Sequence, residues 1–145
     1  MLDHVSIGVR DLAAARQFYD AVLAPLGYGV CYEGEGYVGY GAGKPEFWLN
    51  TTTHPVPGDA RSGLHFSFVA SARAAVDGFH AAGLAAGGSD NGAPGLRPEY
   101  GPRYYAAFLI DHDGYRIEAH TEAAGDFDTD GATAGEAAGG EPGAR

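Results

Sequence analysis

Apolar and polar residues alternate along LDHVSIGVRD, the segment that begins at the second residue of the chain. Val5, Ile7 and Val9 fall on one side of an extended chain, because successive side chains of a strand point to opposite faces. His4 and Ser6 fall on the other side. The alternation predicts a strand with one apolar face and one face of small or polar groups.

A helix is predicted next, in LAAARQFYDAVLAPLG, because its apolar residues recur at helical spacing. Asp11 is the expected N-cap, and Pro25 and Gly27 are expected to end the helix. Three short strands follow, separated by turns that contain glycine or proline: YGVCYEG, YVGYGAG and PEFWLNTTT.

The same order of elements returns after HPVPGDARSG, which has the composition of a linker. GLHFSFVA is a second alternating strand, and SARAAVDGFHAAGLAAGG is a second amphipathic helix, with Ser71 as its expected cap and Gly87 and Gly88 as its stop. One side of this helix is expected to carry Ala75, Val76, Phe79 and Leu84. A looser segment, SDNGAPGLRPEYGPR, precedes two further strands, YYAAFLID and YRIEAH.

The repeat predicts an α+β fold built from two βαβββ modules. We expect the first module at residues 1–53, a linker at 54–62 and the second module at 63–122. Each module alone leaves an open sheet, so the two mixed sheets are expected to pair. Residues 123–145 have almost no large apolar side chains, which is typical of a disordered acidic tail.

Composition narrows the class of protein. The chain has 145 residues and a formal net charge of -10, and 14 acidic and 8 basic residues remain when the expected tail is left out. An acidic body argues against nucleic acid as a partner, and no apolar run is long enough to predict a membrane span. The single cysteine, Cys31, excludes an internal disulfide and favours a cytoplasmic protein.

The repeat also relates two histidines. His4 and His65 occupy matching places in DHVSIGV and LHFSFVA, each two residues before a serine and each opposite the apolar strand face. Glu118, in the last predicted strand, also points away from the apolar side. Two imidazoles and a carboxylate in one enclosed space suit Fe²⁺, Mn²⁺, Zn²⁺, Ni²⁺ or Co²⁺ and leave coordination positions open. Hydrogen-bonded structural histidines and a solvated edge carboxylate are the alternative interpretation.

The chain resembles the vicinal oxygen chelate superfamily, which includes glyoxalase I, bleomycin-resistance proteins, fosfomycin-resistance enzymes and extradiol dioxygenases. The resemblance lies in LDHVSIGVRDLAAARQFYDAVLAPLG, GLHFSFVA and FLIDHDGYRIEAH, and covers roughly residues 1–121. It implies that paired, curved sheets form a cup around a divalent metal ion, with His4, His65 and Glu118 as ligands. The family's turn is often D-P-D-G, whereas this chain has His112 in place of the proline.

The position of a fourth ligand is ambiguous. Glyoxalases supply one, commonly Glu, from the last strand of the first module, where this chain has PEFWLN. Either Glu46 or Trp48 matches the position, and Trp48 there leaves three protein ligands, which resembles the dioxygenase and fosfomycin-resistance patterns. Trp48 and Asn50 share a strand face with Glu46 and are expected to line the substrate site.

Other side chains are candidates for catalysis or binding. His120 follows Glu118 on the same face and is a candidate base or alternative ligand, whereas Arg116 is expected to be solvated. Tyr104 and Tyr105 point to opposite sides, so one of them can face the cavity and donate a hydrogen bond to a bound oxyanion. Tyr104 is the candidate catalytic donor and Tyr105 a candidate lining residue, and core packing of both is the alternative. We expect the final pair, Arg97 and Arg103, to form a lid over an anionic substrate or to lie on the surface.

These residues predict a metal-dependent enzyme that acts on a small, oxygen-rich substrate, with dioxygenase-like or glyoxalase-like lyase chemistry. The alternative is a metal-independent protein that binds a bleomycin-type antibiotic. A homodimer is expected, in which the modules pair within one chain or between chains. The sequence contains no nucleophile elbow, phosphate-binding loop or dinucleotide fingerprint that would indicate a different cofactor.

Overall fold

The computed structural model describes residues 1–125. All but the first three residues of the expected acidic tail therefore lie outside the described residues. Within residues 1–125, neither helix is long and apolar enough to cross a membrane.

The first module contains the five elements that the periodicity predicts. Its sheet has the strand order β1-β4-β3-β2, in which β1 and β4 are parallel and the other neighbours are antiparallel. The Asp11 side chain accepts a hydrogen bond from the backbone N–H of Ala14, so the predicted N-cap is confirmed. The elements are β1 (Val5–Val9), α1 (Leu12–Leu23), the short 3-10 helix η1 (Ala24–Leu26), β2 (Gly29–Gly34), β3 (Tyr37–Gly41) and β4 (Phe47–Thr51).

The second module repeats the first. Its sheet has the order β5-β8-β7-β6, again with the first strand parallel to the last. The predicted duplication is therefore confirmed. The elements are β5 (His65–Val69), α2 (Arg73–Ala85), β6 (Ser89–Leu96), β7 (Tyr105–Ile110) and β8 (Arg116–Thr121), and the segment between the modules contains one 3-10 turn, η2 (Ala60–Ser62).

Three local predictions in this module are wrong. SDNGAPGL, expected to be irregular, forms β6, and its register on β7 shifts at two places around Gly92. Such bulges allow a strand rich in glycine to pair, and they hide its periodicity. The N-cap of α2 is Ala72 rather than Ser71. Leu84 is exposed, because the buried face of α2 is formed by Val76, Phe79, His80 and Gly83.

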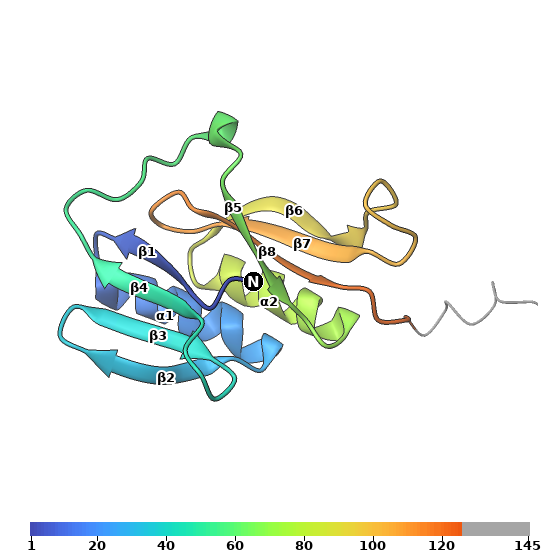
Figure 1. The fold of residues 1–145 in the computed structure, drawn as a ribbon. Helices are drawn as coiled ribbons and strands as arrows, with labels where there is room; N and C mark the ends of the chain where they lie inside the picture. The colour runs from blue at the N-terminus through green and yellow to red at the C-terminus, as the bar shows by residue number, and fades with distance from the viewer. Residues whose placement is uncertain (126–145) are drawn as a thin grey trace, which may run out of the picture.

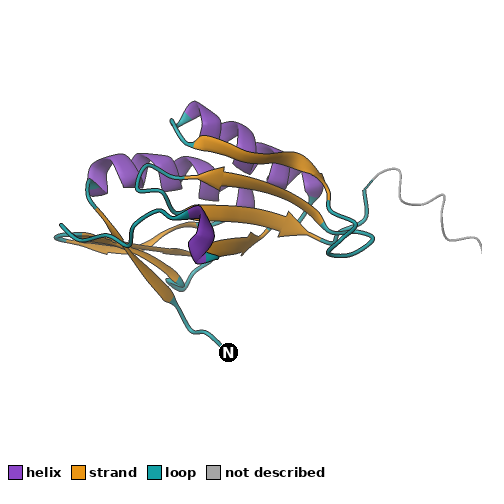
Figure 2. Cartoon of the chain, turned by 90° about the horizontal axis from the view of Figure 1, so that it is seen from above, coloured by secondary structure: helices purple, strands orange, loops and turns teal. Residues whose placement is uncertain are grey.

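The elements form two layers. The helices α1 and α2 pack against each other, and the two sheets lie on the opposite side of the shared core, as Figures 1 and 2 show. The two sheets remain separate, with no hydrogen-bonded strand pair between them among residues 1–125. The expected cup is therefore not closed by strand pairing within one chain, and the outer face of each sheet stays open.

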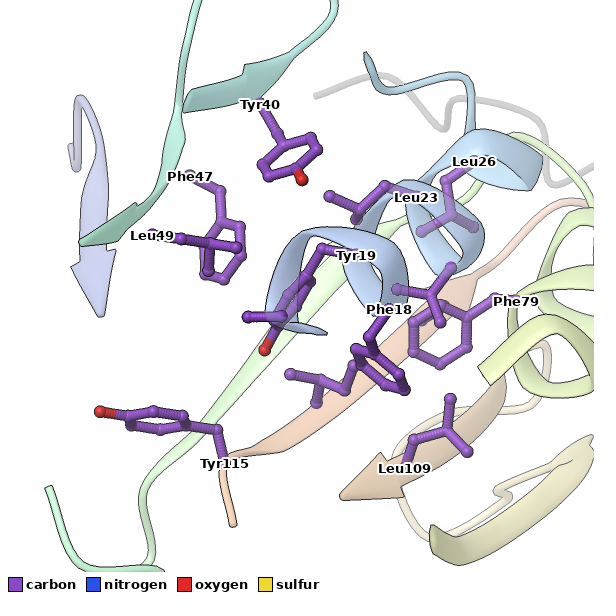
Figure 3. Packing of buried hydrophobic residues seen from close by; sticks show 14 of the residues in the cluster. Phe18, Tyr19, Leu23, Leu26, Tyr40, Phe47, Leu49, Phe79, Leu109 and Tyr115 are labelled. Atoms are coloured by element: carbon purple, nitrogen blue, oxygen red, sulfur yellow. The ribbon is translucent and has the colours of Figure 1, made fainter. Parts of the chain in front are cut away.

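A buried carboxylate joins the two modules in this core. The Tyr19 hydroxyl on α1 donates a 2.7 Å hydrogen bond to Oδ2 of Asp111, at the end of β7. Oδ1 of Asp111 accepts from the backbone N–H groups of Asp113 and Tyr115, which closes the β7–β8 turn. Figure 3 shows Tyr19 and Tyr115 within the apolar cluster, and the Tyr115 hydroxyl donates to the carbonyl of Gly8 in β1. Burial raises the pKa of Asp111, and these three donors oppose that rise.

Replacement of Tyr19 by Phe removes one donor and leaves a buried carboxylate oxygen unpaired. We expect the free energy of unfolding to fall by about 1–3 kcal/mol, measured by urea denaturation. Tyr32→Phe is the matched control, because Tyr32 is exposed, and it is expected to change stability by less than about 0.5 kcal/mol. Equal stability of the wild type and the Tyr19 variant would show that this bond does not hold the modules together.

Candidate functional site

The second sheet brings two of the predicted metal ligands together. The strands β5 and β8 are parallel neighbours, with Ser67 opposite Glu118 and His65 one pleat earlier on the same face. Nε2 of His65 lies 3.3 Å from Oε2 of Glu118. The Glu118 side chain is 3% exposed, whereas the His65 side chain is 53% exposed. A carboxylate is therefore held below the surface, with an imidazole above it.

These side chains face a hollow of about 460 Å³ on the outer face of the second sheet, which we call the Glu118 pocket. Its polar lining combines imidazole, carboxylate, phenol, amide and guanidinium groups, a mixture suited to a small polar molecule. The polar side chains that line it are His65, Asn91, Tyr100, Tyr104, Arg116 and Glu118.

Tyr104 is the closest polar neighbour of the carboxylate. Its hydroxyl donates a 2.6 Å hydrogen bond to Oε1 of Glu118. Burial, and after it the bond to Glu118, raises the pKa of Tyr104 to about 12, so the phenol remains protonated at neutral pH. The next residue, Tyr105, donates instead to Asp77 on α2. The two tyrosines therefore point to opposite sides, as strand alternation predicts, and Tyr105 packs on the core rather than in the Glu118 pocket.

His120 lies beside this pair and is not aimed at it. Its ring stacks on that of Tyr104, with 4.4 Å between centroids and 13° between planes. Its Nδ1 lies 3.4 Å from Oγ of Ser67. Arg116, which we expected to be solvated, is half-buried and donates a 2.7 Å hydrogen bond to the carbonyl of Ala60. This hydrogen bond connects the segment between the modules to β8 beside the Glu118 pocket.

His4 is not part of this cluster. It precedes β1, and its Nδ1 lies 2.9 Å from Oδ2 of the exposed Asp3. Among the described residues, no group of three or more histidine, cysteine or acidic side chains is placed to hold a metal ion. One chain therefore brings together two of the three residues predicted as ligands.

The spacing of His65 and Glu118 is compatible with two ligands of one metal ion. Two ligands bound to the same divalent ion, each at about 2.0–2.2 Å, are separated by roughly 3 Å, close to the distance between His65 Nε2 and Glu118 Oε2. Oε1 is the oxygen engaged by Tyr104, which leaves Oε2 directed toward the imidazole. Histidine nitrogen and carboxylate oxygen suit Fe²⁺, Mn²⁺, Zn²⁺, Ni²⁺ and Co²⁺.

The strand registers show whether Glu46 or Trp48 occupies the position in the first module that is equivalent to Glu118. In the second module Glu118 pairs with Ser67, which lies two residues after His65. In the first module the residue that pairs with the matching serine, Ser6, is Trp48. Trp48 is thus the structural counterpart of Glu118, and Glu46 is the counterpart of Arg116. The register favours a site with three protein ligands, while a ligand role for Glu46 stays a prediction.

Trp48 belongs to an aromatic face that sequence reasoning recognised only in part. The rings of Tyr32, Tyr37 and Trp48 lie 6.1–6.2 Å apart on the outer face of the first sheet. Gly39 pairs with Trp48, and a Cβ at Gly39 would come within 2.8 Å of the indole ring, so the glycine lets the ring lie flat. The alternation in YVGYG is the signal that places Tyr37 on this face. Asn50 pairs with Tyr37 and shares the face.

The two arginines of the expected lid lie in the β6–β7 connection. Arg97 lies over the ring of Phe108 and donates to the carbonyl oxygens of Ala93 and Leu96. Its guanidinium is thus held against the neighbouring strands β6 and β7. Arg103 is exposed in the following turn, and neither arginine lines the Glu118 pocket in this structure. A lid formed by them stays a prediction.

Comparisons with known proteins agree with this fold. Residues 1–119 match the family model described as the Glyoxalase/Bleomycin resistance protein/Dioxygenase superfamily. No curated protein sequence matches the chain.

Several solved structures are similar. A glyoxalase/bleomycin resistance protein from Albidiferax ferrireducens T118 is 34% identical, with a TM-score of 0.71, over 81% of this chain and 96% of that one. A putative glyoxalase from Bacillus halodurans is 26% identical, with a TM-score of 0.61, over 83% and 94%. The fosfomycin resistance protein FosX from Mesorhizobium loti is 20% identical, with a TM-score of 0.60, over 83% and 91%, and shares the fold.

The burial of Glu118 leads to a prediction for the metal-free protein. Removing a carboxylate from water is costly, and here the partners are one phenol and one half-exposed imidazole. Glu118→Gln keeps an oxygen that accepts from Tyr104 and removes the charge. We expect the free energy of unfolding, measured by urea denaturation in the presence of a chelator, to stay equal or to rise by about 1 kcal/mol.

Asp111→Asn provides the contrast, because that carboxylate accepts three hydrogen bonds within the core and the turn. This variant is expected to lose about 1–3 kcal/mol. If Glu118→Gln lowers the free energy of unfolding by a similar amount, Glu118 stabilises the fold and its burial does not indicate a binding role.

Proposed function

Because the chain belongs to the Glyoxalase/Bleomycin resistance protein/Dioxygenase superfamily, we propose that it is a divalent-metal-dependent enzyme acting on a small substrate with neighbouring oxygen atoms. The observation that carries this proposal is the approach of His65 Nε2 to Glu118 Oε2 in an open pocket. A buried carboxylate beside an exposed imidazole does little for the core, but it is an effective pair of metal ligands.

In this proposal the third ligand is His4 of a second copy of the chain. The strands β1 and β5 are both edge strands, and β5 carries His65. Two apolar side chains at this edge, Leu64 and Val69, are 41% and 64% exposed. An open strand edge with exposed apolar groups is suited to association, and a two-fold dimer would bring the β1 of each copy to the β5 of the other. The active form is then a homodimer with two sites.

A divalent ion held by His65, Glu118 and the second copy's His4 would supply a Lewis acid that stabilises negative charge on neighbouring substrate oxygens, and iron or manganese would also supply oxygen-dependent ring cleavage. The protein's own groups bind and orient. Tyr100 and Asn91 line the pocket and are placed to contact the substrate. The first module has Trp48, not a carboxylate, at the position equivalent to Glu118, which leaves three protein ligands. Three protein ligands favour dioxygenase-like chemistry over glyoxalase-like lyase chemistry.

A second candidate function is metal-independent binding of an aromatic, cationic antibiotic of the bleomycin type. The observation that favours it is the aromatic face formed by Tyr32, Tyr37 and Trp48 on an acidic protein. Aromatic rings bind cations and planar groups through their faces. This function requires no metal ion, so metal binding distinguishes the two proposals.

Mixing two inactive variants tests the shared site. His4→Ala and Glu118→Ala are each expected to lose Mn²⁺ binding, because each removes one ligand from both sites of a homodimer. Unfolding the two variants together and refolding the mixture forms heterodimers that contain one site with all three native ligands. We expect about one quarter of the wild-type Mn²⁺ stoichiometry to return, measured by equilibrium dialysis and electron paramagnetic resonance.

The matched control is a mixture of His65→Ala and Glu118→Ala. Both substitutions remove ligands that one and the same chain would contribute to each site. The heterodimers of this mixture contain no complete site, so no Mn²⁺ binding is expected to return. Restoration in neither mixture would contradict the cross-chain arrangement, and wild-type Mn²⁺ binding by His65→Ala would contradict the metal site itself. Tight binding of a bleomycin-type drug by chelator-treated protein would favour the second function.

A further inference from the structure

The Tyr104 hydroxyl is committed to one oxygen of Glu118. It donates to Oε1 at 2.6 Å, whereas His65 Nε2 lies 3.3 Å from Oε2. A phenol has a single proton to donate, so this hydroxyl is not free to donate to a substrate oxygen while the bond is intact. The role that the sequence suggested for Tyr104, donation to a bound oxyanion, therefore does not match its geometry.

We propose that Tyr104 is a positioning residue that holds Oε1 of Glu118, so that Oε2 alone is presented to a metal ion shared with His65. This inference rests on the proposed metal site. A carboxylate that binds through one oxygen occupies one coordination position, and one that binds through both occupies two. Tyr104 would thus keep a position open for the substrate, as hydrogen-bond partners of metal ligands commonly do by fixing ligand orientation.

Several contacts fix the Tyr104 ring in the required place. The Tyr104 N–H donates to the carbonyl of Gly101, and the Tyr104 carbonyl accepts from the N–H of Arg97, which closes the β6–β7 loop on itself. The ring stacks on His120 at 4.4 Å and meets the ring of Tyr100 edge-on at 5.4 Å. A side chain held by two ring contacts and at its backbone can orient a carboxylate with little loss of conformational entropy.

The same geometry assigns His120 a supporting role. Its ring is parallel to that of Tyr104, and its Nδ1 lies near Oγ of Ser67 rather than near Oε2 of Glu118. His120 supplies a flat surface beneath Tyr104. An aromatic ring of similar size at this position should preserve the arrangement, whereas a base or a ligand could not be replaced in this way.

The test uses the full chain, freed of metal with a chelator and titrated with Co²⁺ while binding and the visible absorption spectrum are recorded. Tyr104→Phe keeps the ring and removes the donor. We expect its Kd for Co²⁺ to rise about tenfold, the lower end of the range typical for partners of metal ligands. We also expect the visible bands to change in position and intensity, because the freed Oε1 can join the coordination sphere.

Tyr105→Phe is the matched control. It removes the same atom from the neighbouring residue, whose hydroxyl donates to Asp77 away from the pocket. Its Kd for Co²⁺ and its spectrum should equal those of the wild type. Thermal unfolding of each variant checks that the fold is retained.

Two variants of His120 test the stack. His120→Phe should bind Co²⁺ as the wild type does, and His120→Ala should shift the Kd and the spectrum in the direction of Tyr104→Phe. If His120→Phe loses as much affinity as His120→Ala, the stacking role is wrong and His120 acts through its nitrogen atoms.

His65→Ala separates failure of this inference from failure of the proposed function. If His65→Ala abolishes Co²⁺ binding and Tyr104→Phe matches the wild type in Kd and spectrum, the metal site stands and the positioning role is overturned. If His65→Ala binds Co²⁺ normally, or if the wild type binds none, the proposed metal site fails and the positioning role fails with it.

Discussion

The shared core between the two helices and the two sheets is the constraint on which the rest of the structure depends. Both modules bury the inner faces of their sheets against α1 and α2, and Asp111 ties α1 to the β7–β8 turn. Because the inner faces are occupied by packing, polar groups on the strands are left on the outer faces. The positions of His65, Glu118 and Trp48 follow from this division, since each has the opposite strand parity to the core residues of its own strand.

The division also explains why one chain brings together only two of the three residues predicted as ligands, His65 and Glu118. A core that joins the modules through their helices does not join their outer faces, and β1 and β5 remain edges of separate sheets. In the proposed dimer, folding and site assembly become separate events, because each chain has its own core and the site forms only on association. A metal ion that binds the assembled site would then stabilise the dimer by mass action.

The sequence predicts much of this, and its failures have physical causes. Strand alternation and the DHVSIGV and LHFSFVA match predict the two modules and the outward face of Glu118. The same period of two cannot choose between Glu46 and Trp48, because residues two apart share a face, so the choice requires the strand register. The strand β6 was missed because its bulges break the alternation. The hydrogen bond from Tyr104 to Glu118 depends on the conformation of the β6–β7 loop. A loop has no periodic pattern of apolar residues, so the sequence did not predict this bond.

The two modules have the same strand order, but they carry chemically different side chains at equivalent positions. At the position that faces the serine of the first strand, the second module has Glu118 and the first has Trp48. In an edge-to-edge dimer these two positions would face the same cup from opposite sides. A carboxylate there binds a cation, whereas an indole that lies flat over Gly39 offers a surface for a planar group. In the proposed dimer the second module would supply two metal ligands, and Trp48 of the first module would remain the substrate-lining residue that the sequence predicts.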